Sequence, residues 1–251
     1  EATKGLKFGK FNYGAIIKNG RSCLRTLDGG RAIVFGDFTL KDKRIKHIIR
    51  TNETHVNLGT SIEKVEKSGV ILFNSYSTIG TEVLSNLHLC RMEYEGKVFH
   101  SSEQLFYWLR LTGYPEHQEA LLQCSTPKET KKLGDRFMKK LGISDDIYRD
   151  VQLLRLAIRV KYNCCREFKA FLDNHPDIPI VEYAWWGDDE YGCVDEKSGL
   201  KYDWTQGSVI GKNVCGRIIK GVRDEPKDEN GLCIITRPEC LDTMRPLTLF
   251  S

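Results

Sequence analysis

The chain has 251 residues, a net charge of +4, 40% hydrophobic residues and 29% charged residues. This length allows one large domain, or one domain with a small appendage, and the composition is that of an ordinary globular protein. The apolar runs are too short to cross a bilayer, since Val70–Phe73 has only the length of a buried strand, so no membrane partner is expected.

Residues 1–69 read as short strands separated by glycine turns, because β-branched and aromatic residues fill the segments between the turns. Residues 1–70 hold 14 Lys and Arg against 7 Asp and Glu, and the run Lys41–His47 is the densest part. Such a run is either a nucleic-acid contact or a solvated face. We therefore predict a β-rich basic extension at this end.

Helical signals begin after about residue 70. Ser101 can cap a helix, with Gln104 as the capping-box partner three residues later. Thr126-Pro127 followed by Glu129 predicts a second helix start, and Gly142 can end that helix. An apolar stripe predicts a third helix over residues 145–162.

The last segment, residues 226–251, has three prolines and no periodicity, so it is either a tail or a strap packed on the domain. The predicted organisation is an extension over 1–69, a catalytic domain over 70–225 and this C-terminal segment. We predict an α+β fold that is mainly helical in the central domain.

The nine cysteines include no Cys-x-x-Cys pair, and Cys164 and Cys165 are adjacent, which does not suit a tetrahedral metal site. No metal and no other cofactor are therefore expected. Scattered cysteines in a chain of this length predict reduced thiols and an intracellular protein, cytoplasmic or nuclear.

Three polar clusters interrupt the helical core. In the first, Glu103, Tyr107 and Arg110 share one helix face, and the neighbouring apolar residues favour partial burial over a solvated face. The second, Glu182–Gly192, combines aromatic surface, acids and glycines. The third, Gly211–Asn213, offers a cation and free backbone N–H groups at a helix start, which suits a phosphate, although such a turn is usually only structural.

Taken in order, these clusters and the segments around them resemble NADAR domains and their YbiA-like relatives over about residues 70–225. The matching segments are Leu84–Leu87, Ser102–Phe106, Lys131–Gly134, Lys161-Tyr162, Glu182, Trp186–Asp188, Tyr191-Gly192, Gly211–Gly216 and Val222-Arg223. The resemblance implies a YbiA-like α+β domain that hydrolyses N-glycosidic bonds. Some members act on phosphoribosyl-amine intermediates of riboflavin biosynthesis, and others remove ADP-ribose from guanine bases.

Breaking a ribose–nitrogen bond builds positive charge on the sugar, so a carboxylate beside the anomeric carbon stabilises the transition state. The resemblance assigns this role to Glu103 or Asp188, and the other orients the ribose or activates water. Trp186 is expected to stack on a base or sugar, with ordinary core packing as the alternative. Lys212 is expected to hold a phosphate, and Glu182 is either a ligand contact or the partner of a cation. The remaining expected contacts to substrate are Ser85, Asn86, Tyr107, Lys161, Gly187, Tyr191, Gly211 and Asn213.

One departure from the family pattern concerns Arg110, which stands where the family has a lysine that forms a Schiff base with the opened sugar. A guanidinium cannot form one. Three alternatives follow: catalysis by carboxylates alone with Arg110 gripping phosphate or ribose, an amine from another lysine such as Lys161, or lost catalysis through a natural or engineered replacement.

The leading hypothesis is an N-glycosidase that releases ADP-ribose from modified guanine in DNA or RNA. A hydrolase of a small phosphoribosyl-amine metabolite is the alternative among enzymes. A module that binds ADP-ribose without cutting it is the alternative of a different class, and Arg110 is the residue that motivates it.

Overall fold

A computed structural model describes residues 62–76, 80–184, 186–196 and 207–244, and the backbone of three strands nearer the N-terminus. The chain divides into two compact units, Glu1–Ile62 and Glu63–Ser251. Within the described ranges, no helix combines the length and the apolar character needed to cross a membrane.

The first unit contains an antiparallel sheet with the strand order β1 (Tyr13–Lys18), β2 (Arg21–Thr26) and β3 (Ala32–Phe35). Its first two strands pair from Tyr13 with Thr26 to Lys18 with Arg21. The β-rich character expected for this part of the chain is therefore confirmed for these strands. The basic run 41–47 lies outside the described residues.

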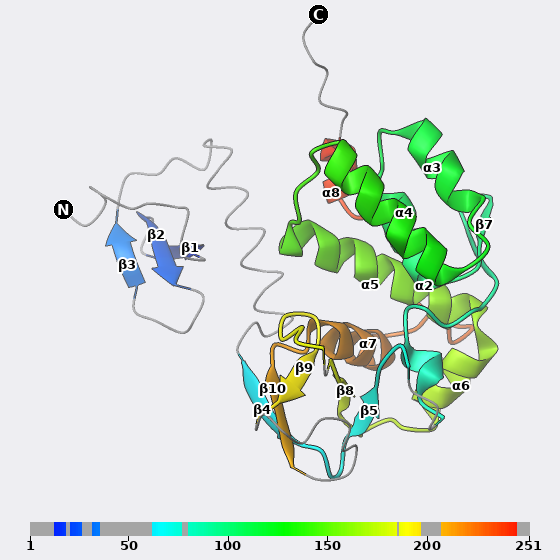
Figure 1. Cartoon of the computed structure of the whole chain (residues 1–251). Coiled ribbons are helices and arrows are strands. Elements are labelled where there is room, and N and C mark those ends of the chain that lie inside the picture. The colour runs from blue at the N-terminus through cyan, green and yellow to red at the C-terminus, as the bar shows by residue number, and fades with distance from the viewer. Residues whose placement is uncertain are drawn as a thin grey trace, which may run out of the picture. The chain divides into compact units, whose positions relative to one another are not determined.

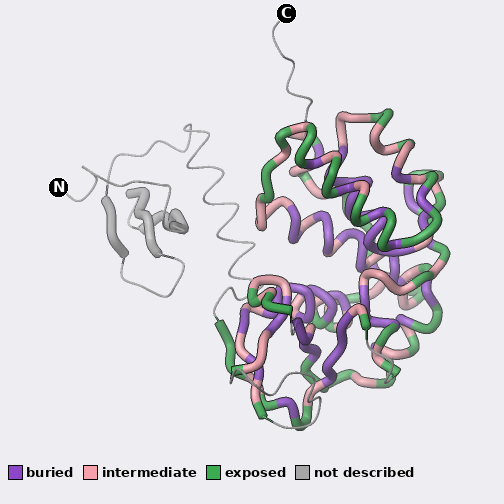
Figure 2. The backbone as a smooth tube through the Cα atoms, in the orientation of Figure 1, coloured by how far each residue is buried: buried purple, intermediate pink, exposed green. Residues whose placement is uncertain are grey.

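The second unit is an α+β domain in which helices predominate (Figure 1). Its helices are η1 (Glu82–Leu84), α2 (Ser102–Arg110), α3 (Pro115–Leu122), α4 (Pro127–Lys140), α5 (Ile147–Cys164), α6 (Arg166–Asp173), α7 (Val214–Asp224) and α8 (Cys240–Thr243). Helix α5 contacts α2 on one side and α7 on the other, and Figure 1 shows it between them. Figure 2 shows that buried residues follow the inner face of α5 and much of α2 and α7.

Three small sheets complete this unit. Strands β4 (Glu63–Glu66), β10 (Ser208–Gly211) and β9 (Cys193–Asp195) form an antiparallel sheet in that order. Strands β5 (Ile71–Phe73) and β8 (Ile180–Glu182) pair in parallel. Strands β6 (Met92–Tyr94) and β7 (Lys97–Phe99) form a hairpin.

The predicted helix starts are confirmed by their caps. The Ser101 hydroxyl accepts from the backbone N–H of Gln104, and the Gln104 side chain accepts from the N–H of His100. The Thr126 hydroxyl accepts from the N–H of Glu129, with proline at the first helical position. These bonds satisfy donors that a helix start would otherwise leave open, so they fix where α2 and α4 begin.

Strand pairing sets the position of Glu182, a residue of the candidate active site. Because β5 and β8 are parallel, Leu72 pairs with Val181, and Glu182 follows at the end of β8. Leu72 and Val181 belong to an apolar cluster with Tyr183, Cys193 and Val209. Helix α7 packs against β8 where Gly216 lies, since a Cβ there would be 2.3 Å from the carbonyl oxygen of Ile180.

The first and the last described segments of this unit contact its core. The compact unit begins seven residues before the predicted boundary of 69/70, because β4 pairs with β10 and the buried Lys67 ammonium lies 2.5 Å from Asp195. After α7, the amide nitrogen of Asn163 donates to the carbonyl of Cys233 at 2.9 Å, and Leu241 is buried. Residues 226–244 therefore pack on the domain.

Candidate active site

Glu103 begins the carboxylate cluster in the first turn of α2. Only 8% of the residue is exposed, and its backbone N–H donates to the carbonyl of Asn86 at 3.1 Å. Burial raises the pKa of Glu103, and the nearby Asp135 raises it further, whereas Lys131 and Arg110 act in the opposite direction. The carboxylate thus lies in a desolvated place with cations close by.

Glu182 is the second carboxylate of this cluster, at the end of β8. Burial raises the pKa of Glu182 to about 7, and the charges of Asp188 and Glu103 raise it too. The Cys215 thiol, at the start of α7, acts in the opposite direction and lowers the pKa of Glu182. A carboxyl group with a pKa near neutrality holds its proton half the time at pH 7, which is the property of a general acid.

Asn86 connects the two carboxylate segments. Its amide nitrogen lies 3.6 Å from the sulfur of Cys215, and its amide oxygen accepts from the Ser102 hydroxyl at 3.1 Å. The residue before it, Ser85, is buried. The two predicted contacts, Ser85 and Asn86, therefore lie beside the Glu103 segment and the Cys215 segment together.

Helix α4 brings a cation to Glu103. The Lys131 ammonium lies 3.9 Å from the Glu103 carboxylate, and 58% of the lysine side chain is exposed. Helices α2 and α4 approach closely at Gly134, where a Cβ would be 2.2 Å from the ring of Tyr107. The Tyr107 hydroxyl donates to Asp135 of α4. Tyr107 consequently joins the two helices beside the site.

Arg110, at the end of α2, is held by two carboxylates. Its guanidinium lies 2.5 Å from Asp145 and 3.1 Å from Asp150, and it lies over the ring of Phe106 at 5.4 Å. Within the described part of the chain, its buried Nε has no hydrogen-bond partner. The terminal nitrogen of this guanidinium is therefore paired with acids of the protein itself. Its Nε donor is left for a further acceptor.

The segment 186–191 follows β8, and its conformation depends on a glycine and an aspartate. Gly187 has a φ of +112°, a backbone conformation that favours glycine. The Asp188 carboxylate accepts from the backbone N–H groups of Glu190 and Tyr191 at 3.1 and 2.9 Å. Asp188 thereby fixes this loop while its charge acts on Glu182.

An exposed aromatic residue of this loop, Trp186, meets a second one, Tyr76. Trp186 is 45% exposed and Tyr76 60%, and their rings meet edge to face with centroids 6.3 Å apart. The Lys128 ammonium from α4 lies 5.2 Å from the centre of the Tyr76 ring. Exposed aromatic surface beside cations is suited to a planar, anionic ligand. Core packing, the alternative for Trp186, does not fit its exposure.

The Gly211–Asn213 turn packs against this same loop. The backbone N–H groups of Lys212 and Asn213 donate to carbonyls of the loop, as do those of Val214 and Cys215. The expectation of free N–H groups at this helix start is therefore wrong, because the loop carbonyls occupy them. Gly211 is required by the close approach, since a Cβ there would be 2.4 Å from the carbonyl oxygen of Gly192.

The two side chains of this turn are also engaged. The Lys212 ammonium lies 2.6 Å from Glu190. The Asn213 amide accepts from the N–H of Glu182 at 3.0 Å and donates to the carbonyl of Ile180 at 2.9 Å, with its backbone left-handed. Asn213 thus positions Glu182 through the backbone of β8.

Lys161 is fully buried on α5. Its ammonium donates to the carbonyls of Val83 and Ser85, both at 2.7 Å, and lies 4.5 Å from the centre of the Phe168 ring. Burial lowers the pKa of Lys161 to about 8. These bonds hold the segment before Asn86, and they leave the amine without access to a substrate.

Three residues that the sequence did not assign to the site lie in it. Lys131 could have been found from the sequence, because the helix that begins after Thr126 places it one turn before Gly134. Cys215 and Tyr76 could not have been found in this way. Tyr76 contacts a tryptophan 110 positions away, and only the folded chain brings the two rings together.

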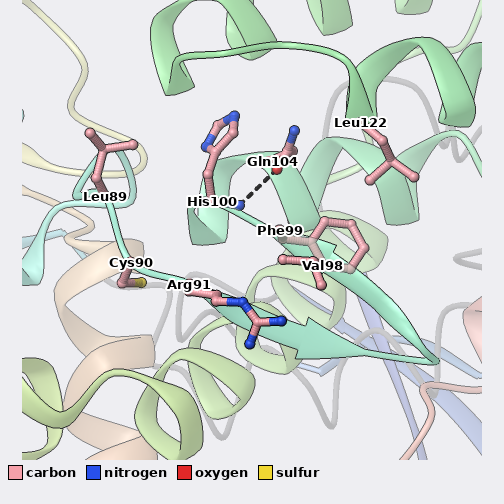
Figure 3. Close-up of a pocket in the computed structure, with 8 residues that line it drawn as sticks. All are labelled: Leu89, Cys90, Arg91, Val98, Phe99, His100, Gln104 and Leu122. Carbon is pink, nitrogen blue, oxygen red and sulfur yellow. Dashed lines mark hydrogen bonds between the residues drawn. The ribbon is translucent and has the colours of Figure 1, made fainter.

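Metal ligation finds no support in the described ranges, where no group of three or more His, Cys, Asp or Glu side chains is placed to hold an ion. A separate open hollow of about 420 Å³ lies on another part of the domain (Figure 3). Its lining residues are Leu89, Cys90, Arg91, Val98, Phe99, His100, Gln104 and Leu122. It contains none of the predicted site residues.

Comparisons with known proteins find a likeness in structure. No protein-family model matches the sequence, and no curated protein matches it. The NMR structure of the Escherichia coli protein YbiA is similar, with 20% sequence identity and a TM-score of 0.45 over 64% of this chain and 86% of that chain. At these values the likeness defines neither the family nor the activity of this chain.

Proposed function

We propose that the chain is an N-glycosidase that releases ADP-ribose from modified guanine bases of nucleic acid. The observation that carries the proposal is a pair of carboxylates, the buried Glu103 and the half-buried Glu182, with Lys131 at the first and exposed aromatic rings in the adjoining segments. Hydrolysis of a ribosyl–nitrogen bond uses one acid and one base, and these carboxylates have different surroundings.

Glu182 is the proposed general acid. Burial raises the pKa of Glu182, and the charges of Asp188 and Glu103 raise it too, so the protonated form is able to give a proton to the departing base nitrogen. Glu103, beside Lys131, is the proposed carboxylate that stabilises positive charge on the ribose and takes a proton from the attacking water. The water then supplies the hydroxyl on the anomeric carbon. Asp188 supports both by fixing the loop.

Trp186 and Tyr76 are the proposed platform for the base. Flat rings accept any base by stacking, at about 1–3 kcal/mol per base in known cases. The donor Nε of Arg110 and the ammonium of Lys131 are the proposed contacts for ribose hydroxyls or phosphate. On this proposal no amine is needed, which agrees with the burial of Lys161 and the ion pairs of Arg110.

The nucleic-acid part of the proposal is supported by α4. Its exposed residues include six cations and two acids, and the helix runs from the Tyr76 side chain past Glu103. The cations are Lys128, Lys131, Lys132, Arg136, Lys139 and Lys140. From Lys128 to Lys139 the helix rises about 16 Å, enough to follow several phosphates of one strand.

Release of ADP-ribose from an ADP-ribosylated oligonucleotide, measured by chromatography, tests the activity. Glu103→Gln and Glu182→Gln are each expected to lower the rate at least about 100-fold. Glu229→Gln, an exposed carboxylate outside the site, is the matched control and is expected to leave it unchanged. Absence of release both by this chain and by an Arg110→Lys variant contradicts the proposal, and binding of ADP-ribose without turnover identifies a binding module instead.

Charge reversal on α4 separates nucleic acid from a small substrate. The triple variant Lys132→Glu, Arg136→Glu, Lys139→Glu is expected to weaken oligonucleotide turnover steeply, and its salt dependence is expected to flatten by about 0.7 per lost phosphate contact. Turnover of the free ADP-ribosylated nucleoside is the internal control and should stay constant. Equal losses on both substrates would favour a small phosphoribosyl-amine substrate.

A further inference from the structure

A buried cation holds the segment that joins η1 to the candidate active site. Lys161, on α5, is fully buried, and its ammonium donates to the carbonyls of Val83 and Ser85, both at 2.7 Å. These carbonyls belong to the end of η1, where a cation is favoured, and Asn86 follows directly. Two charge-assisted hydrogen bonds from one ammonium therefore fix the backbone on the N-terminal side of Asn86.

The surroundings of this ammonium are uncharged. Among the residues that the structure describes, none provides a carboxylate partner for Lys161, and the ring of Phe168 lies 4.5 Å from its ammonium. Burial lowers the pKa of Lys161 to about 8, so the ammonium form still predominates at pH 7. A buried cation without a countercharge costs more than an apolar side chain of similar size. Directing two carbonyls is the contribution that an apolar side chain could not make.

Asn86 connects this constraint to the start of α2. Its carbonyl accepts from the backbone N–H of Glu103 at 3.1 Å. The Ser102 hydroxyl is shared between the same carbonyl, at 3.3 Å, and the side-chain oxygen of Asn86, at 3.1 Å. The first turn of α2 is thereby bound to the segment that Lys161 holds, and Glu103 in that turn carries one of the two proposed carboxylates.

We propose that Lys161 is a positioning residue for Glu103 and acts through the backbone from Ser85 to Asn86. This role rests on the proposed function, because Glu103 is the carboxylate that stabilises positive charge on the ribose. A carboxylate with that task must keep its place relative to the anomeric carbon, and a displacement of about 1 Å lowers a rate by about 100-fold. Lys161 itself contacts no substrate. It sets where the first turn of α2 lies relative to η1.

Hydrogen exchange at two neighbouring amides tests the positioning without relying on catalytic activity. The N–H of Glu103 is bonded to the distant Asn86, whereas the N–H of Gln104 is bonded locally to the Ser101 hydroxyl at 3.2 Å. Lys161→Met keeps a side chain of similar length and removes the ammonium. It should speed exchange at Glu103 at least about tenfold and change exchange at Gln104 by less than about threefold. NMR of the isotope-labelled full chain measures both rates.

Two further variants complete the exchange experiment. Lys220→Met is the matched control, because Lys220 is an exposed lysine of α7 that pairs with Asp224. It should leave exchange at both amides within about threefold of the unaltered chain. Should Lys161→Met not fold, Lys161→Gln removes the charge, keeps neutral donors on a shorter side chain, and gives the same comparison of the two amides.

Kinetics add a readout that a loss of stability alone does not produce. With an ADP-ribosylated oligonucleotide, Lys161→Met should lower kcat at least about tenfold and leave KM within about threefold, since Glu103 acts on the transition state. An unchanged kcat overturns the positioning role. If the unaltered chain releases no ADP-ribose, the proposed function fails, and the exchange rates still decide the role of Lys161.

Three exchange results also overturn the proposal. The first is equal acceleration at Glu103 and Gln104, which indicates general destabilisation of the domain. The second is unchanged exchange at Glu103 in the folded Lys161→Met variant. The third is a Glu103 amide that exchanges in the unaltered chain as fast as in an unfolded peptide, a result that needs no variant.

Discussion

Glu182 lies at the end of a strand, where burial raises its pKa and neighbours from three other segments shift that pKa further. Asp188 comes from the following loop, Glu103 from α2 and Cys215 from α7. Each of these groups reaches Glu182 only through tertiary contacts. The proposed acid is therefore a property of the assembled domain, and its titration reports on that assembly.

Activity is expected to depend on pH through this group. Because the pKa of Glu182 is raised to about 7, its acid form dominates below pH 7, and kcat/KM should fall about tenfold per pH unit above it. Glu182→Gln should remove this limb along with most of the activity. Initial rates between pH 5.5 and 9 provide the measurement, and a profile that is flat across pH 7 speaks against Glu182 as the acid.

Stability gives an independent check on the same group. A carboxyl whose pKa is raised in the folded state stabilises fully below its unfolded pKa, and this contribution is lost as the pH rises through about 7. Relative to the native chain, Glu182→Gln should accordingly gain thermal stability at pH 8.5 and not at pH 5. Glu229→Gln, which is exposed, should show the same difference at both pH values.

For single residues, the sequence predicted which side chains belong to the candidate site better than it predicted their hydrogen-bond partners. The motifs predicted three residues that lie in or beside one site in the structure, namely Glu103, Asn86 and Trp186. The motif around Lys161 gave no sign that its ammonium would be consumed by two carbonyls, because those acceptors lie 76 and 78 positions away. Long-range hydrogen bonds leave no periodic signal in a sequence.

Among the elements, α2 and α4 form the pair of helices on which the site depends. Their closest approach is at Gly134, where the Tyr107 ring occupies the space that a side chain would need. Both helix starts follow from local capping chemistry and were predictable. The parallel pairing of β5 with β8 was not, since it joins residues 109 positions apart and depends on packing.

Gly134→Ala is expected to destabilise the domain by about 1–3 kcal/mol, because the added methyl group overlaps Tyr107. The matched control is Gly221→Ala in α7, where the nearest atom, from Arg155, is 4.0 Å away. That substitution should be neutral or stabilising by up to about 1 kcal/mol, since alanine favours helix. Urea unfolding measures both, and equal effects would show that the α2–α4 approach is not constrained by Gly134.

At the scale of the whole molecule, the catalytic proposal concerns the unit that begins at Glu63. The sequence boundary at residue 70 followed a change in helical pattern and could not reveal that β4 belongs to the β10 sheet. Buried Lys67, with Asp195 and Tyr183, adds an ionic contact across the same boundary. A change in the hydrophobic pattern therefore did not mark the start of the domain, which depends on the pairing of β4 with β10.

Two truncations test this boundary. A fragment of residues 63–251 should unfold with a free energy within about 1 kcal/mol of the full chain. A fragment of residues 70–251 should lose about 3–5 kcal/mol, because it removes β4 and leaves Asp195 without its buried cation. Denaturant melts followed by circular dichroism decide the matter, and indistinguishable fragments would show that β4 is dispensable.

The exposed indole beside Tyr76 has an optical consequence. Trp108 is buried against Phe99, so its emission belongs to an apolar environment, whereas Trp186 faces water and emits at longer wavelength. A purine that stacks on Trp186 would quench the long-wavelength emission of that residue and leave the emission of Trp108 in place. The protein therefore carries its own fluorescent indicator of occupancy, readable in a stopped-flow instrument without any attached dye.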